Sequence, residues 1–216
     1  MPPKVKICGI RTIDAALASI NDSADFLGFI HFPKSPRHLT LNAMKDLMSA
    51  IRGVNATIPL VSVVVNPEND TLKTLRDEIR PDLIQLHGKE TPERVAEIAA
   101  LTNLPLIKAI SVSEKSDLAG VSAYAPYVRY MLFDAKTPKD AALPGGMGLS
   151  FDWTIMQAYA SETPWFLAGG LSVENAAEAI ALSGAPMLDI SSGVESAPGV
   201  KDAGLISGFL RVAKAL

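Results

Sequence analysis

Two side chains far apart in the sequence could together exchange protons with a substrate. Cys8 is the only cysteine of the 216 residues, which excludes an intrachain disulfide, and it ends an apolar run that begins at Val5. Asp134 directly follows a second apolar run, Tyr130–Phe133. A thiol and a carboxyl at strand ends are groups suited to general acid–base catalysis. A lone cysteine is also commonly a small buried hydrophobe. Whether Cys8 is catalytic or structural therefore depends on which groups the rest of the chain supplies.

Candidate anion-binding groups follow other apolar runs. Arg37 lies in the segment His31–His38, where two prolines stiffen the backbone, and a guanidinium fixed in this way suits a bidentate carboxylate. A solvated loop arginine is the alternative. Glycines that let backbone N–H groups approach a phosphate recur in the last third of the chain, although each could instead be a plain turn. The phosphate-binding candidates are Gly146, Gly148, Gly169, Gly170, Ser192 and Gly193.

The elements that must position these groups follow a repeated order. Strand-like apolar runs alternate with segments of 3.6-residue periodicity, and a last helix is expected near Leu205–Leu216. Eight strands, each followed by a helix, predict an α/β protein with a single (β/α)8 TIM barrel over residues 1–216. An open doubly wound sheet is the alternative. The expected strands are Val5–Cys8, Phe26–Phe29, Leu60–Val65, Leu83–Leu86, Leu106–Ala109, Tyr130–Phe133, Trp165–Ala168 and Met187–Ile190.

Loop lengths and strand parity indicate where the site lies. The intervals after the second and sixth strands are about ten residues longer than most others, so His31–His38 and Ala135–Ser150 are expected at the catalytic face. Alternate strand residues face the interior of a barrel. If Cys8 points inward, the same phase predicts a polar network toward one mouth, made of Lys6, Gln85, His87, Lys108, Asp134, Asp189 and Ser191. Within it, Lys108 and Asp189 are candidates for a buried ion pair.

Composition argues against several kinds of partner. The net charge is −3 and no Lys/Arg-rich face is evident, which disfavours nucleic acid. The longest apolar run, Leu60–Val65, is too short to span a bilayer. The start Met1–Lys4 leaves no room for a signal peptide, and one cysteine fits a reducing compartment, so a cytoplasmic location is expected. Composition does not decide between a monomer and a homodimer.

Eight short motifs occur in order between Lys4 and Glu195. They are Lys6-Ile7-Cys8-Gly9-Ile10, Ser35-Pro36-Arg37, Gln85-Leu86-His87-Gly88, Phe133-Asp134, Gly145-Gly146-Met147-Gly148, Phe151-Asp152-Trp153, Leu167-Ala168-Gly169-Gly170-Leu171 and Asp189-Ile190-Ser191-Ser192-Gly193-Val194-Glu195. Together they resemble the phosphoribosylanthranilate isomerase family of tryptophan biosynthesis. The resemblance implies a (β/α)8 barrel, without cofactor or metal, that acts on a small phosphorylated sugar. The implied reaction is the Amadori rearrangement of N-(5-phosphoribosyl)anthranilate to 1-(2-carboxyphenylamino)-1-deoxyribulose 5-phosphate.

The resemblance also implies roles for single residues. Cys8 matches the family's general base and Asp134 its general acid, while Arg37 matches the contact to the anthranilate carboxylate. His87 and Asp189 match motif residues and are expected to bind substrate. The phosphate-binding backbone falls on the glycine and serine positions given above. The chain departs from the family pattern at Met147, where Ser or Thr is usual, and at Ala135, where a small hydroxyl residue is usual.

The implied chemistry needs a thiolate together with a carboxylic acid. Free thiols and carboxyls have pKa values of about 8.5 and 3.9, which favours the opposite arrangement, so the site has to narrow this gap. Lys6 could favour the thiolate of Cys8. Two alternatives remain. One is a related phosphoribosyl isomerase of histidine biosynthesis, which by resemblance has an aspartate where Cys8 stands, and the other is a phosphate-ligand-binding barrel without catalysis.

Overall fold

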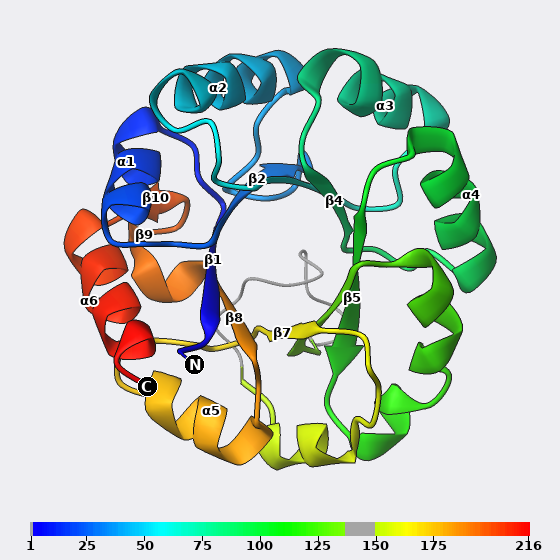
Figure 1. The fold of residues 1–216 in the computed structure, drawn as a ribbon, viewed down its shortest axis with the longest axis vertical. Helices are drawn as coiled ribbons and strands as arrows, with labels where there is room; N and C mark the ends of the chain where they lie inside the picture. The colour runs from blue at the N-terminus through cyan, green and yellow to red at the C-terminus, as the bar shows by residue number, and fades with distance from the viewer. Residues whose placement is uncertain (1, 137–149) are drawn as a thin grey trace.

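The structure, a computed structural model, describes residues 2–136 and 150–216. Within these residues, eight parallel strands form a closed barrel in sequence order, and β8 pairs back onto β1 (Figure 1). The predicted (β/α)8 TIM barrel is thus confirmed. Each strand begins within one residue of its expected start. The strands are β1 (Lys4–Cys8), β2 (Phe26–His31), β3 (Leu60–Val64), β4 (Leu83–Leu86), β5 (Leu106–Val112), β6 (Tyr130–Ala135), β7 (Trp165–Leu167) and β8 (Met187–Ile190).

Helices surround the barrel on its outside (Figure 1). Several begin at a threonine whose side-chain oxygen accepts a hydrogen bond from a backbone N–H of the first turn, as at Thr12, Thr40 and Thr91. Pro92 then occupies the first turn after Thr91, where its missing N–H costs nothing. The α-helices of the described residues are α1 (Ile13–Asn21), α2 (Leu41–Val54), α3 (Asn69–Thr74), α4 (Pro92–Thr102), α5 (Ala176–Ser183) and α6 (Ala203–Lys214).

The helical segment after β5 is not an α-helix. Two short 3-10 segments follow this strand, η2 (Lys115–Leu118) and η3 (Val121–Tyr127). Gly120 between them has a φ of 77°, and Pro126 lacks the N–H that an α-helix would use, so the chain cannot continue as one helix. The other short elements are η1 (Leu75–Ile79), η4 (Trp153–Ala158), η5 (Ser192–Val194), β9 (Glu195–Ala197) and β10 (Val200–Lys201).

Strand parity separates the buried side chains into two layers. The outer layer packs under the helices and contains Ile7, Ile84, Leu86, Phe133, Leu188 and Ile190, as the parity predicted. The inner layer contains Cys8, Phe26, Val61, Val63, Leu83, Ile107, Ala109, Leu132, Phe166, Ala168 and Met187. The inward assignment of Lys108 is wrong, because Ile107 and Ala109 on either side of it take the inner positions. Its ammonium instead binds Glu90 at 2.9 Å, outside the barrel interior.

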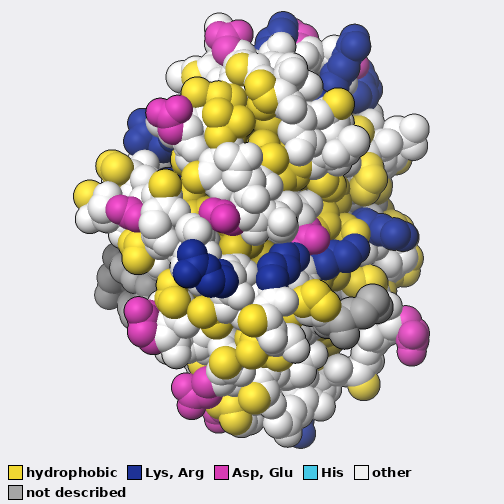
Figure 2. Space-filling view, turned by 60° about the vertical axis from the view of Figure 1, so that its left-hand side comes forward, with side chains coloured by type: hydrophobic (Ala, Val, Ile, Leu, Met, Phe, Trp, Pro, Cys, Tyr) yellow, Lys and Arg dark blue, Asp and Glu magenta, His cyan; other side chains and the backbone are white. Residues whose placement is uncertain are grey.

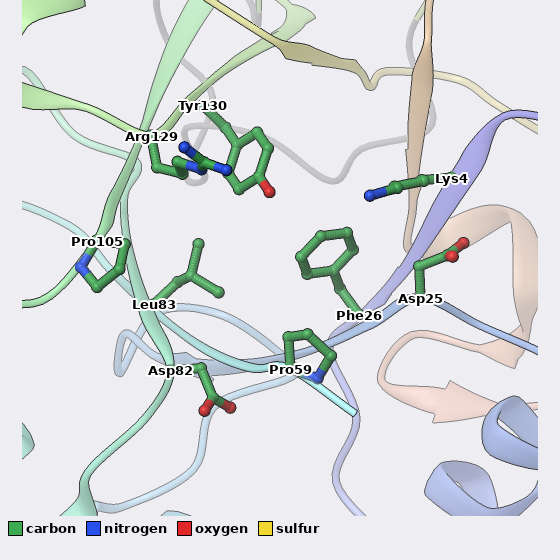
Figure 3. Close-up of a pocket in the computed structure, with 9 residues that line it drawn as sticks. All are labelled: Lys4, Asp25, Phe26, Pro59, Asp82, Leu83, Pro105, Arg129 and Tyr130. Carbon is green, nitrogen blue, oxygen red and sulfur yellow. The ribbon is translucent and has the colours of Figure 1, made fainter. Parts of the chain in front are cut away.

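An aromatic layer closes the barrel at the amino ends of its strands. Phe26, Tyr130 and Phe166 pack edge to face, with ring centroids 5.3 to 5.9 Å apart. A cavity of about 350 Å³ opens at this end, and Lys4, Phe26, Leu83 and Tyr130, the first residues of four strands, are among its lining (Figure 3). No residue predicted for catalysis or binding lines it. This cavity therefore lies at the end of the barrel opposite the predicted site.

The outer surface carries charges of both signs. A short band of Lys and Arg side chains crosses the face shown in Figure 2, and Asp and Glu side chains lie close to it. This mixture agrees with the small net charge of −3. None of the helices within residues 2–136 and 150–216 combines the length and the hydropathy that a membrane span requires.

Candidate active site

Strand β1 delivers an amine and a thiol to the interior of the barrel. Lys6 is fully buried and Cys8 is 5% exposed. Gly28 on β2 pairs with Cys8, and a Cβ atom at Gly28 would lie 2.9 Å from both Cys8 Sγ and Lys6 Nζ. The thiol and the ammonium therefore share the space that this glycine leaves. A side chain at position 28 would force one of them to move.

An aspartate on β8 completes this group. Asp189 lies opposite Lys6 in the β1–β8 register, and Lys6 Nζ donates to Asp189 Oδ1 at 2.8 Å. The expected pairing of Asp189 with Lys108 is thus corrected. Burial disfavours the ammonium, but Asp189 and Cys8 together outweigh it and raise the pKa of Lys6. The site consequently holds a permanent cation beside the thiol.

The pKa of the Cys8 thiol depends on its burial and on the charges of Lys6 and Asp189. Burial raises the pKa of Cys8, the Lys6 ammonium opposes this effect, and the Asp189 carboxylate adds to it. The net result is a raised pKa, so the thiol form dominates at neutral pH in this structure. Removing Lys6 and removing Asp189 should therefore have opposite effects on the thiolate.

A second group surrounds Asp134 near the end of β6. Asp134 Oδ1 accepts a hydrogen bond from the Ala135 backbone at 2.9 Å, and its Oδ2 lies 3.3 Å from His87 Nε2. His87 Nδ1 lies 2.9 Å from Gln85 Nε2. Gly169, with a φ of 86°, lies so close that an added Cβ would be 3.0 Å from Asp134 Oδ1. The structure thus brings together three residues that the sequence placed separately: His87, Asp134 and Gly169.

Arg37 makes a contact that was not predicted. Its Nε and Nη2 atoms donate to the two carboxylate oxygens of Glu195, both at 2.7 Å, and its side chain is 4% exposed. Gly9, with a φ of 81°, makes room for it, since a Cβ there would lie 2.6 Å from Arg37 Cδ. The loop after β2 is thereby held against the end of β1. The guanidinium is fixed, as expected, although by Glu195 and not by its loop alone.

Glu195 also binds a second cation that the sequence analysis missed. Lys201 Nζ donates to Glu195 Oε1 and to the Ser191 carbonyl, both at 2.8 Å, and its side chain is 2% exposed. Burial would raise the pKa of Glu195, but Arg37 and Lys201 outweigh it and lower the pKa. One carboxylate between two cations leaves a local charge of about +1. Glu195 closes the last sequence motif, which was the available signal, whereas Lys201 belongs to the β9–β10 hairpin that no motif indicated.

The described part of the predicted phosphate site is contiguous. Gly169 and Gly170 have φ values of 86° and 66°, which only glycine adopts without strain. Ser192 and Gly193 lie in η5, and an added Cβ at Gly193 would collide with the Leu171 carbonyl, so the loops after β7 and β8 pack closely. The other two predicted residues, Gly146 and Gly148, lie outside the described residues together with Met147.

These groups define a class of protein. A closed parallel barrel with acid–base and anion-binding side chains at the carboxyl ends of its strands is the arrangement of (β/α)8-barrel enzymes. Residues 5–212 match the family described as N-(5'phosphoribosyl)anthranilate (PRA) isomerase, and the chain belongs to this family. The resemblance seen in the sequence motifs is thus confirmed.

Similar proteins support the assignment over the full length. The N-(5'-phosphoribosyl)anthranilate isomerase of Paramagnetospirillum magneticum is 45% identical over 214 residues, which cover 99% of this chain and 98% of that protein. The isomerase of Parvibaculum lavamentivorans is 44% identical, with 99% of both chains covered. The crystal structure of the Thermotoga maritima enzyme has a TM-score of 0.85 at 32% identity and covers 99% of this chain and 100% of that one. A further structure of such an isomerase, in complex with reduced 1-(o-carboxyphenylamino)-1-deoxyribulose 5-phosphate, has a TM-score of 0.82 at 30% identity, with 99% of this chain and 100% of that one covered.

Proposed function

We propose that the chain catalyses the Amadori rearrangement of N-(5-phosphoribosyl)anthranilate, with Cys8 as general base and Asp134 as general acid. The observation that carries this assignment is that Cys8 and Asp134 lie at the carboxyl ends of two strands of one barrel, Cys8 beside the Lys6 ammonium and Asp134 beside His87. Relatives of 44–45% identity named for this reaction support the substrate.

The reaction needs one proton donor and one proton acceptor. Asp134 protonates the ring oxygen as the C1′–oxygen bond breaks, and the lone pair of the anthranilate nitrogen forms the iminium ion. The Cys8 thiolate then removes the proton at C2′, and the electrons of that C–H bond form the double bond of the enolamine. Tautomerisation gives the ketone. Because each residue acts on a different atom of the ribose, the sugar has to lie between them.

Lys6 is assigned to the stabilisation of the thiolate, and the pH dependence of kcat/KM tests this role. Since the pKa of Cys8 is raised, activity should increase with pH as the thiolate forms. Lys6→Gln removes the opposing cation and should move this ascending limb to higher pH, whereas Asp189→Asn removes the anion and should move it to lower pH. Both variants break the same buried ion pair, so each is the stability control for the other. If the ascending limbs of both pH profiles moved in the same direction, Lys6 would not be the group that stabilises the Cys8 thiolate.

Arg37 is proposed to bind the anthranilate carboxylate. A charge-assisted hydrogen bond contributes about 1.5–3 kcal/mol, so Arg37→Ala should raise KM about 10- to 100-fold and leave kcat nearly unchanged. Glu195 keeps Lys201 as a partner in this variant, which limits the loss of stability that thermal unfolding would measure. A large fall in kcat at unchanged KM would show that Arg37 acts in the chemical step instead.

The phosphate is proposed to bind backbone N–H groups of the loops after β7 and β8, at Gly169, Gly170, Ser192 and Gly193. Gly146 and Gly148, which lie outside the described residues, belong to the same proposed site on the basis of the sequence motif alone. A small phosphorylated sugar is thus the expected ligand, and a complex of a relative with a reduced product analogue supports this.

A cytoplasmic location also remains a prediction. The choice between monomer and homodimer is open, and one related structure is described as a monomer generated from a dimeric enzyme.

An assay with freshly generated N-(5-phosphoribosyl)anthranilate tests the proposed function. Turnover of this compound, measured by coupling its product to the next enzyme, is the expected result. Turnover of only the phosphoribosyl substrate of histidine biosynthesis would favour the first alternative. Binding of the reduced product analogue without turnover of either substrate would favour a barrel that has lost catalysis.

A further inference from the structure

A glutamine and a histidine stand behind Asp134 in a line. Gln85 lies in β4, and His87 directly follows the last residue of that strand in the same phase, so both side chains point to the same side. Gln85 Nε2 lies 2.9 Å from His87 Nδ1, and His87 Nε2 lies 3.3 Å from Asp134 Oδ2. The Gln85 residue is 1% exposed, and the side chains of His87 and Asp134 are 15% and 8% exposed. Nδ1 of the ring thus has a hydrogen-bonding partner, and Nε2 lies within ion-pair distance of the proposed acid.

The other end of the Gln85 amide is unsatisfied. Among the described residues, Gln85 Oε1 is buried and has no hydrogen-bond partner. No contact to Oε1 among the described residues fixes the orientation of the Gln85 amide. A half-turn about the Cγ–Cδ bond would bring Oε1 instead of Nε2 to His87 Nδ1. With the nitrogen toward the ring, Gln85 donates to an unprotonated Nδ1. With the oxygen toward the ring, it accepts from an Nδ1–H group.

We infer that Gln85 and His87 are positioning residues that let the His87–Asp134 pair hold the proton given to the substrate. This inference rests on the proposed role of Asp134 as general acid. When the Gln85 oxygen faces Nδ1–H, the ring can carry a second proton on Nε2, directly beside Asp134 Oδ2. An imidazolium with a carboxylate and an imidazole with a carboxylic acid contain the same number of protons, so the pair acts as one donor.

The proton count balances over one turnover. The proton on His87 Nε2 passes to Asp134 Oδ2, and from there to the ring oxygen of the ribose as its C1′–oxygen bond breaks. His87 is then neutral with a proton on Nδ1, and Asp134 is a carboxylate. Water returns one proton to Nε2, which the partial exposure of His87 allows. Cys8 gives up to water the proton that it took from C2′, so the enzyme ends the cycle with the protons it began with.

The charged groups around the ring leave Asp134 as its direct counter-ion. On β5, the Lys108 side chain points away from the barrel interior. Its ammonium donates to Glu90 Oε2 and to the Gly88 carbonyl, both at 2.9 Å. Glu90 in turn accepts from the Gly88 N–H. This ion pair neutralises itself and holds the backbone turn that follows His87. Because Lys108 and Glu90 neutralise each other, the Asp134 carboxylate is the charged group that the His87 imidazole faces.

Nitrogen NMR of the histidine side chains tests the inference without substrate. At one fixed pH, Asp134→Asn and Gln85→Leu should each lower the fraction of His87 that is protonated on both nitrogens at least about threefold below the fraction in the wild type. Gln85→Glu, whose side chain can only accept, should restore the fraction lost in Gln85→Leu. Gln157→Leu is the matched control, because Gln157 is exposed on η4 and should have no effect. Equal fractions in wild type, Asp134→Asn and Gln85→Leu would overturn the inference.

Kinetics provide the second readout. His87→Asn and Gln85→Leu should lower kcat at least about tenfold and change KM less than about threefold, because both residues act through Asp134 in this scheme. A KM raised more than about tenfold by His87→Asn at unchanged kcat would instead support the substrate contact that the sequence motifs imply for His87. An unchanged kcat in both variants would overturn the inference. If the wild type does not convert N-(5-phosphoribosyl)anthranilate at all, the proposed function fails, whereas the NMR result still decides whether the pair shares a proton.

Discussion

Cys8→Ala is expected to lower kcat by about a thousandfold or more. The variant removes the group that takes the proton from C2′, and a positioned general base contributes about 10²–10⁴-fold. No other cysteine can replace it, since Cys8 is the only one in the chain. The measurement is the rate of product formation at saturating substrate, with the reduced product analogue used to show that binding persists.

The Cys8→Ala variant should remain folded. Cys8 contributes one buried sulfur to an inner layer that also contains Val61, Val63 and Leu132, so its loss leaves a small cavity. Cys8→Ser controls for this cavity because it fills nearly the same volume with a hydroxyl that does not ionise near neutral pH. Both variants should be inactive. Full activity in purified Cys8→Ala would remove Cys8 from the mechanism.

Asp134→Asn is expected to cause a loss of similar size for a different reason. The amide has the shape of the carboxyl and can still accept the Ala135 N–H hydrogen bond that Asp134 Oδ1 accepts at 2.9 Å. It has no acidic proton to give to the ring oxygen, so ring opening should be slowed by about 10²–10⁴-fold. The measurement is kcat together with the thermal unfolding midpoint, which should change little.

The hydrogen at C2′ distinguishes the two variants. Removal of this hydrogen follows ring opening, so with Asp134→Asn a substrate deuterated at C2′ should react slowly and with a reduced isotope effect, because ring opening has become limiting. A full primary isotope effect in Asp134→Asn would mean that proton removal still limits the rate. Asp134 would then not be the group that opens the ring.

Much of the barrel could be predicted because its strands are short apolar runs separated by segments of helical periodicity. The parity of Lys6, Cys8, His87 and Asp134 also followed from counting alternate residues along each run. Lys108 broke the pattern, since its amine points away from the interior and is neutralised by Glu90, a residue beyond the end of its neighbouring strand. A polar residue in a strand therefore does not identify the interior unless its partner is known.

The sequence predicted which residues belong to the site more readily than which of them contact one another. The bidentate pair of Arg37 and Glu195 joins residues 158 positions apart, and Lys201 reaches Glu195 only because β9 and β10 form a hairpin. Neither contact has a local sequence signature. The motifs identified candidate residues at the ends of the strands. Which of these residues contact one another depends on how the closed barrel arranges the strands.

A crystal structure of this protein with reduced 1-(2-carboxyphenylamino)-1-deoxyribulose 5-phosphate is the most direct measurement of whether a sulfur and a carboxyl act on one sugar. We predict that Cys8 Sγ contacts C2′ on one side of the ligand, while Asp134 lies within about 3.2 Å of the oxygen derived from the ribose ring on the other. A ligand bound with either side chain out of reach of its atom, or with both on the same side, would contradict the mechanism.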